Sequence, residues 1–143
     1  MDFSISKQEG TIFPILVAIS FAHLLNDMMQ SVIPSIYPII KDEYGLSFIQ
    51  IGIITLVFQM TSSILQPLVG LYSDRHPHPF SLSTGMLFTF AGIILLSLAN
   101  NFGLIILAVA VVGLGSSIFH PESSRIAQMA GGCLLYTSPS PRD

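Results

Sequence analysis

Hydrophobic residues fall into four long runs along the chain, separated by short polar segments. Two stretches contain no Asp, Glu, Lys or Arg at all, Tyr44 to Ser73 and the residues between Arg75 and Glu122. Uncharged runs of this length exceed the ~20 apolar residues that cross a bilayer as a helix. The pattern predicts an all-α integral membrane protein. We expect transmembrane helices at about residues 11–40, 48–72, 81–100 and 102–130.

One polar stripe interrupts the first hydrophobic run. His23, Asn26, Asp27 and Gln30 share one helical face at about 100° per residue. A carboxylate near the middle of a membrane helix costs at least ~2.5 kcal/mol on insertion scales. We therefore predict that these side chains line a polar cavity, where Asp27 takes up and releases protons with His23 as a relay partner. The alternative is a buried charge that pairs with His23 for helix packing.

Weaker polar features mark the second and fourth runs. Gln59 belongs to a stripe in the second run and is a candidate for the cavity wall, although interhelical hydrogen bonds of ~0.6 kcal/mol each explain such a stripe equally well. In the fourth run His120 and Glu122 form a second cluster, and Arg125 is spaced to pair with Glu122 on one helical face. The cluster serves either the substrate or a structural gate.

A latch between the second and fourth helices is a further hypothesis. Asp74 and Arg75 end the second helix on the side of the membrane where Glu122 and Arg125 lie, which would allow the cross-pairs Asp74–Arg125 and Arg75–Glu122.

The few basic residues also orient the chain by the positive-inside rule. This rule puts residues 1–10, the second loop and the end of the fourth helix in the cytoplasm.

The composition and the motifs that are missing argue against several classes of function. Only 9% of the residues are charged and the net charge is −3, which gives no case for nucleic acid as a partner. No phosphate-binding loop, dinucleotide fingerprint or nucleophile elbow is present, so we predict no enzyme and no cofactor. We predict no metal site either, because the H-E-x-x-H motif is missing and His23 and His120 are expected at different depths. A membrane-embedded metal enzyme is the distant alternative.

The last eleven residues, 133–143, break from the preceding pattern. The sequence CLLYTSPSPRD resembles the in-frame translation of a sequencing-library adapter, and such a scar is excluded from fold reasoning. The alternative is a disordered Ser/Pro-rich tail, in which case the four helices would form a complete small membrane module. The single Cys133 excludes an internal disulfide.

A family resemblance follows from these motifs. Gly70, Asp74 and Arg75 form the G-x-x-x-D-R pattern, which is similar to the loop-two signature of the major facilitator superfamily, although Pro77 stands where the family has glycine. Three longer stretches look like the fosmidomycin-resistance branch of that superfamily: ISFAHLLNDMMQSVIPSIYP, IGIITLVFQMTSSILQPLVGLYSDRHP and GLGSSIFHPESSRIAQMA. The resemblance covers nearly all of residues 11–132.

This resemblance implies a twelve-helix antiporter of a bacterial inner membrane, driven by protons and exporting a drug or small organic anion. Residues 11–132 would supply the first four helices of the first six-helix half, with the first and fourth helices lining the cavity and the third outside. The remaining helices would come from a missing C-terminal portion, so the 143 residues alone would not transport. A facilitator for another solute, such as a sugar or carboxylate, is the alternative.

Overall fold

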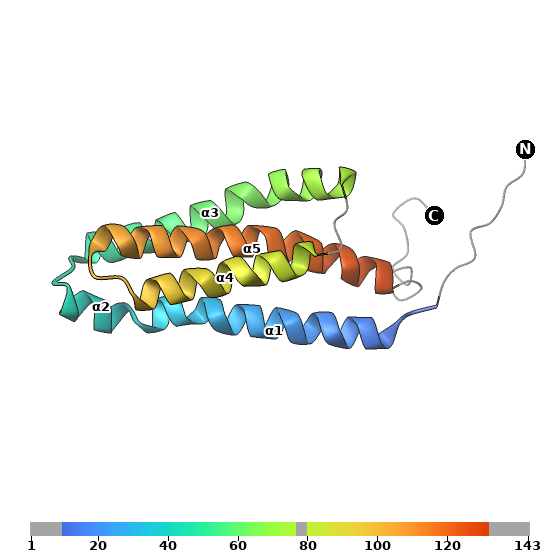
Figure 1. Ribbon diagram of the computed structural model, residues 1–143, viewed down its shortest axis with the longest axis horizontal. Coiled ribbons are helices and arrows are strands. Elements are labelled where there is room, and N and C mark those ends of the chain that lie inside the picture. Colours follow the sequence, from blue (N-terminus) through green and yellow to red (C-terminus); the bar gives the residue numbers. More distant parts are fainter. Residues whose placement is uncertain (1–9, 77–79, 132–143) are drawn as a thin grey trace, which may run out of the picture.

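Five helices account for nearly all of the described part of the chain, residues 10–76 and 80–131 of a computed structural model. They lie roughly along one common axis (Figure 1). Three spans have the length and composition to cross a membrane, Phe13–Glu43, Phe48–Ser73 and Phe102–Gly131, whereas Ser81–Ser97 is a shorter apolar helix. The helices are α1 Phe13–Ser35, α2 Tyr37–Glu43, α3 Phe48–Arg75, α4 Ser81–Ser97 and α5 Phe102–Gly131.

The first predicted helix is divided into α1 and α2. The break falls at Ile36, two residues before Pro38. Pro38 has no amide N–H to donate to the carbonyl of Pro34, and its ring would clash with that carbonyl in a continuous helix. The segment expected as a polar turn is therefore partly helical, since α2 continues to Glu43 and the chain turns at Tyr44 and Gly45.

The central element is α5, which lies between α3 on one side and α1 and α4 on the other (Figure 1). Because α5 contacts three helices, it carries the largest set of buried side chains, and most of these are small. Gly113 is an example: a Cβ atom there would lie 3.0 Å from the carbonyl oxygen of Phe58 on α3. The expectation that Gly113 permits a close helix approach is therefore confirmed.

Small residues also join α4 to α5, on a face that the sequence analysis did not separate from the rest of this helix. Gly85, Thr89, Gly92 and Leu96 are buried, at spacings of four, three and four residues. A Cβ atom on Gly85 would lie 2.9 Å from the backbone nitrogen of Phe119. Other side chains of α4 are exposed, so this helix presents one close-packed face to α5 and apolar faces to its surroundings.

The turns at the far end of the bundle are held by side-chain caps. Ser47 and Gln50 form a capping box at the start of α3. The Asn101 side chain accepts a hydrogen bond of 2.9 Å from the backbone N–H of Leu104 at the start of α5. Tyr44 donates its hydroxyl to the carbonyl of Ala99 at 2.7 Å, which ties the two turns together.

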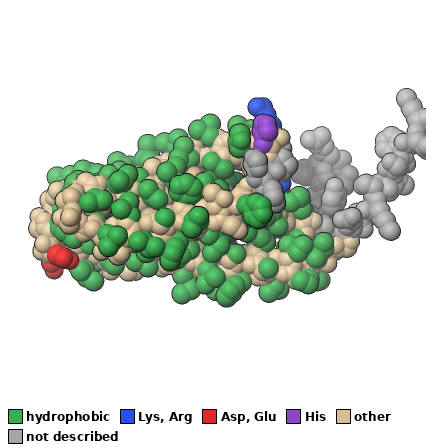
Figure 2. All heavy atoms as spheres, in the orientation of Figure 1, with side chains coloured by type: hydrophobic (Ala, Val, Ile, Leu, Met, Phe, Trp, Pro, Cys, Tyr) green, Lys and Arg blue, Asp and Glu red, His purple; other side chains and the backbone are tan. Residues whose placement is uncertain are grey.

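The distribution of side chains on the surface fits a membrane-spanning bundle. On the face shown in Figure 2, hydrophobic side chains cover the length of the helices, while acidic side chains lie at one end and basic and histidine side chains at the other. Large apolar residues on several helices are more than half exposed, among them Phe21, Leu56 and Leu87. Lipid or further protein must cover these surfaces, because monomeric soluble proteins rarely expose apolar patches of this extent.

Candidate functional site

Two hydrogen bonds set the register between α1 and α5. The backbone N–H of Ile12 donates to the carbonyl of Ala130 at 2.9 Å, and the Thr11 hydroxyl donates to the carbonyl of Gly131 at 2.9 Å. The start of α1 therefore lies beside the end of α5. His23 is 11 residues after Ile12 and His120 is 10 residues before Ala130, so at ~1.5 Å per residue both lie about 15 Å from this junction. The expectation that these histidines lie at different depths is wrong.

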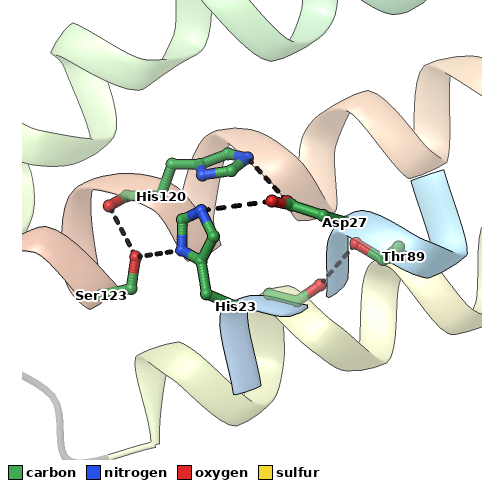
Figure 3. A network of polar contacts seen from close by, with 6 residues as sticks. His23, Asp27, Thr89, His120 and Ser123 are labelled. Atoms are coloured by element: carbon green, nitrogen blue, oxygen red, sulfur yellow. Dashed lines mark hydrogen bonds and ion pairs between the residues drawn. The ribbon is translucent and has the colours of Figure 1, made fainter. Parts of the chain in front are cut away.

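The result is a cluster of three ionisable side chains, the His–Asp–His cluster, made of His23, Asp27 and His120 (Figure 3). The Nε2 atom of His23 lies 3.4 Å from Oδ2 of Asp27, and the Nε2 atom of His120 lies 4.0 Å from Oδ1 of the same carboxylate. The two imidazole rings are 4.9 Å apart between centroids. Asp27 therefore faces both histidines, whose rings also contact each other edge to face.

Ser123 orients one histidine of the cluster. Its hydroxyl donates to the carbonyl of His120 at 3.0 Å, and its oxygen lies 3.4 Å from Nδ1 of His23, a contact whose donor depends on the tautomer of this ring. With the proton on Nε2, His23 donates directly to the Asp27 carboxylate. With the proton on Nδ1, Nε2 and the carboxylate face each other as two acceptors and together can bind a cation, either a proton or a metal ion.

The cluster is partly open in the described structure. The side chain of Asp27 is 52% exposed and that of His120 is 27% exposed. The neighbouring polar residues of the predicted stripe are more enclosed. Asn26 is fully buried, and within residues 10–76 and 80–131 neither of its amide atoms has a hydrogen-bond partner, nor does the amide nitrogen of Gln30. The amide groups of Asn26 and Gln30 are therefore further hydrogen-bonding groups beside the cluster, on the side of α1 that faces the bundle.

Gln59 is not brought to the cluster. It lies exposed on α3 and makes no polar contact with His23, Asp27 or His120 among the described residues. The stripe to which it belongs meets the first helical span elsewhere: the Tyr37 hydroxyl lies 2.8 Å from that of Thr55. This contact is an interhelical hydrogen bond, the alternative that the sequence left open for the second run.

Glu122 and Arg125 form an ion pair within α5. Nη2 of Arg125 lies 2.7 Å from Oε2 of Glu122, whose side chain is only 1% exposed and whose Oε1 has no partner in the part of the chain that the structure describes. The expected cross-pair between Arg75 and Glu122 is not formed, because Arg75 is exposed and Glu122 pairs with its neighbour one helical turn away. The side chain of Asp74 lies outside the described residues, as do His78 and the tail at 133–143.

Glu122 lies between two cavities, near the end of the bundle where α3 ends and α4 begins. The larger, about 550 Å³, is lined mainly by apolar residues of α3, α4 and α5, and the smaller, about 200 Å³, also contacts Gly70 and Arg125. Gly70 lies beside α5, and a Cβ atom there would make only an ordinary contact of 3.8 Å with Cβ of Pro121, so the approach of α3 to α5 does not require glycine at this position. Neither cavity includes the His–Asp–His cluster, so the second predicted group is split: His120 joins α1 and Glu122 faces α3 and α4.

Sequence reasoning missed Ser123 and Thr89. Ser123 lies three residues after His120 on the same face of α5, a spacing that could have identified it as a neighbour of this histidine. Thr89 donates its hydroxyl to the carbonyl of Gly85 within α4, and no pattern in the sequence distinguishes it from the other hydroxyl residues of that helix (Figure 3).

Ionisable side chains gathered between membrane-spanning helices are typical of multi-pass membrane transporters. The sequence profile of the Major Facilitator Superfamily matches residues 19–129, which is most of the chain. The chain belongs to the Major Facilitator Superfamily. This assignment confirms the all-α, multi-pass class and sets aside the membrane-embedded enzyme.

Comparison with curated proteins gives the same family. The chain is 59% identical over 122 residues to the fosmidomycin resistance protein of Escherichia coli (strain K12), an alignment that covers 85% of this chain and 30% of that protein. It is 44% identical over 129 residues to an uncharacterized MFS-type transporter, YfnC, of Bacillus subtilis (strain 168), which covers 90% of this chain and 32% of the relative. No solved structure matches the chain.

The chain thus spans about a third of the length of the relatives that it matches. A more distant similarity, 31% identity over 124 residues, extends to a probable vesicular acetylcholine transporter-B of Danio rerio and covers 25% of that protein. The matched region is the same part of the chain that carries the His–Asp–His cluster.

Proposed function

We propose that the protein is a proton-driven antiporter that exports a drug or small organic anion, with fosmidomycin as the leading candidate. The observation that carries this proposal is the His–Asp–His cluster, which sets one carboxylate between two imidazoles on facing transmembrane helices. The name and 59% identity of the Escherichia coli relative support the substrate class.

The mechanism proposed for the whole protein is alternating access. Two halves rock against each other around a site near the middle of the membrane, and the described helices contribute one wall of that site. An anionic substrate requires cationic partners, and Arg125, the basic side chain nearest to the cluster in sequence, is already paired with Glu122. Further cationic groups would come from helices that these 143 residues do not contain. The 143 residues alone are not expected to transport.

Drug resistance tests the proposed function directly. We expect the full-length gene, expressed in a host that lacks its own exporter, to raise the concentration of fosmidomycin that stops growth. Dissipation of the proton gradient should abolish export from the same cells. Unchanged sensitivity, together with proton-linked uptake of a sugar or a carboxylate, would replace the export proposal with the alternative solute class.

We also propose that the protein lies in a bacterial inner membrane with its N-terminus in the cytoplasm. The supporting feature is the placement of Arg75 after α3 and Arg125 near the end of α5, at the same end of the bundle as the start of α1. A reporter enzyme that is active only in the cytoplasm, fused after Arg75, should be active, and one fused after Gly45 should be inactive. The reverse pattern would invert the topology.

A further inference from the structure

The atoms of the His–Asp–His cluster have the chemistry of a transition-metal site. One atom from each of His23, Asp27 and His120 can be chosen so that all three lie within 4.8 Å of one another. Zinc binds imidazole nitrogen at about 2.0–2.1 Å and carboxylate oxygen at about 2.0–2.2 Å. Ligand atoms around such an ion are therefore a little over 3 Å apart. The two separations that involve Asp27, 3.4 Å and 4.0 Å, approach this value, and all three ligand atoms lie within 4.8 Å of one another, so rotation of the side chains is needed to close the site.

The surroundings of the cluster also resemble those of metal sites. A histidine that binds a metal usually donates its other ring N–H to a nearby oxygen, which fixes the ring and its tautomer. Ser123 provides that oxygen for His23, and the Ser123 hydroxyl is itself held by the carbonyl of His120. In the tautomer with its proton on Nδ1, His23 directs its unprotonated Nε2 at the carboxylate 3.4 Å away.

We propose that His23, Asp27 and His120 bind a divalent transition-metal ion of the zinc type through three protein ligands. Two imidazoles and one carboxylate favour zinc and similar ions over Mg²⁺ or Ca²⁺, which prefer ligand sets made of oxygen. The partial exposure of Asp27 and His23 leaves at least one coordination position open to water or to a solute. The inference rests on the positions of the atoms, and it goes beyond the proposed function because binding of the ion requires no transported solute.

Binding is tested on the purified full-length protein, carrying no polyhistidine tag, by calorimetric titration with Zn²⁺. We expect one ion per chain, no binding of Mg²⁺, and a loss of affinity of more than about 100-fold in His120→Ala. The Ser123→Ala variant should lose about tenfold, as supporting ligands typically do. His76→Ala is the matched control, because His76 lies at the end of α3, where it stacks on Tyr72 away from the cluster, and this variant should bind as the unmodified protein does.

Asp27→Asn provides an independent variant if His120→Ala does not fold, since the half-exposed Asp27 side chain contributes little to packing. This variant should also lose more than about 100-fold in affinity. Zinc affinity that stays unchanged in whichever of the two variants folds, or preferential binding of Mg²⁺, would overturn the metal site. Because these measurements use no substrate and no proton gradient, failure of the metal site and failure of the export proposal give different results.

Discussion

Asp27→Asn in the full-length protein is expected to reduce proton-driven export to the level of membranes that lack the protein. The substitution keeps the shape of the side chain but removes the one carboxylate of the His–Asp–His cluster, and the neutral amide cannot hold a cation between the two imidazoles. Insertion should be unaffected or improved, since a carboxylate in a membrane helix costs at least ~2.5 kcal/mol. Export into everted vesicles and the amount of protein in the membrane are the two measurements.

The matched control is Asp42→Asn. Asp42 lies in α2 with its side chain 85% exposed, and its nearest charged partner, Lys41, is 4.0 Å away. This variant should export at the rate of the unmodified protein. Normal export by Asp27→Asn would place the coupling group elsewhere in the protein and would remove the main support for the proposed mechanism.

Arg125→Ala is expected to destabilise the protein by about 3–5 kcal/mol, the usual effect of removing one partner from a buried ion pair. Glu122 is almost fully buried, and among the described residues its other carboxylate oxygen has no partner. Without Arg125 the buried carboxyl group would lose its cationic partner beside an apolar cavity. The double variant Glu122→Gln/Arg125→Gln, which removes both charges, should recover most of the loss. Chemical unfolding in detergent measures the difference.

Lys41→Ala serves as the comparison for this experiment. The pair of Lys41 with Asp42 is long, the Asp42 side chain is 85% exposed, and Lys41 also lies 4.8 Å from the centroid of the Phe48 ring, so this replacement should change stability by about 1 kcal/mol. Equal effects of Arg125→Ala and Lys41→Ala would show that the buried pair contributes nothing. A double variant less stable than Arg125→Ala would show instead that the two residues support the fold through other contacts.

The helices and their polar faces could be predicted from the sequence because both depend on local patterns. Uncharged runs determine where membrane helices form, and the spacing of His23 and Asp27 places them on one face whatever their neighbours are. Even the division at Ile36 has a local cause, because Pro38 lacks the N–H that would continue the hydrogen-bond pattern of α1.

Which faces meet could not be predicted, because helix register depends on contacts that are distant in sequence. His120 was grouped with Glu122 because the two residues are close along the chain. Residues two positions apart in a helix point in different directions, however, so His120 faces Asp27 of α1 while Glu122 lines the larger cavity. The latch between Arg75 and Glu122 failed for the same reason. A partner within one helical turn, Arg125, was available to Glu122 without any interhelical contact.

The central position of α5 has a consequence for the order of assembly. His120 is made 97 residues after His23, and at about 5–20 residues per second the ribosome needs roughly 5–20 s to add this stretch. During that interval α1 has neither its register bonds to residues 130 and 131 nor the histidine that faces Asp27. The carboxylate of α1 therefore gains its second histidine neighbour only when α5 is made, and residues 120–131 complete the contacts between α1 and α5 in the described bundle.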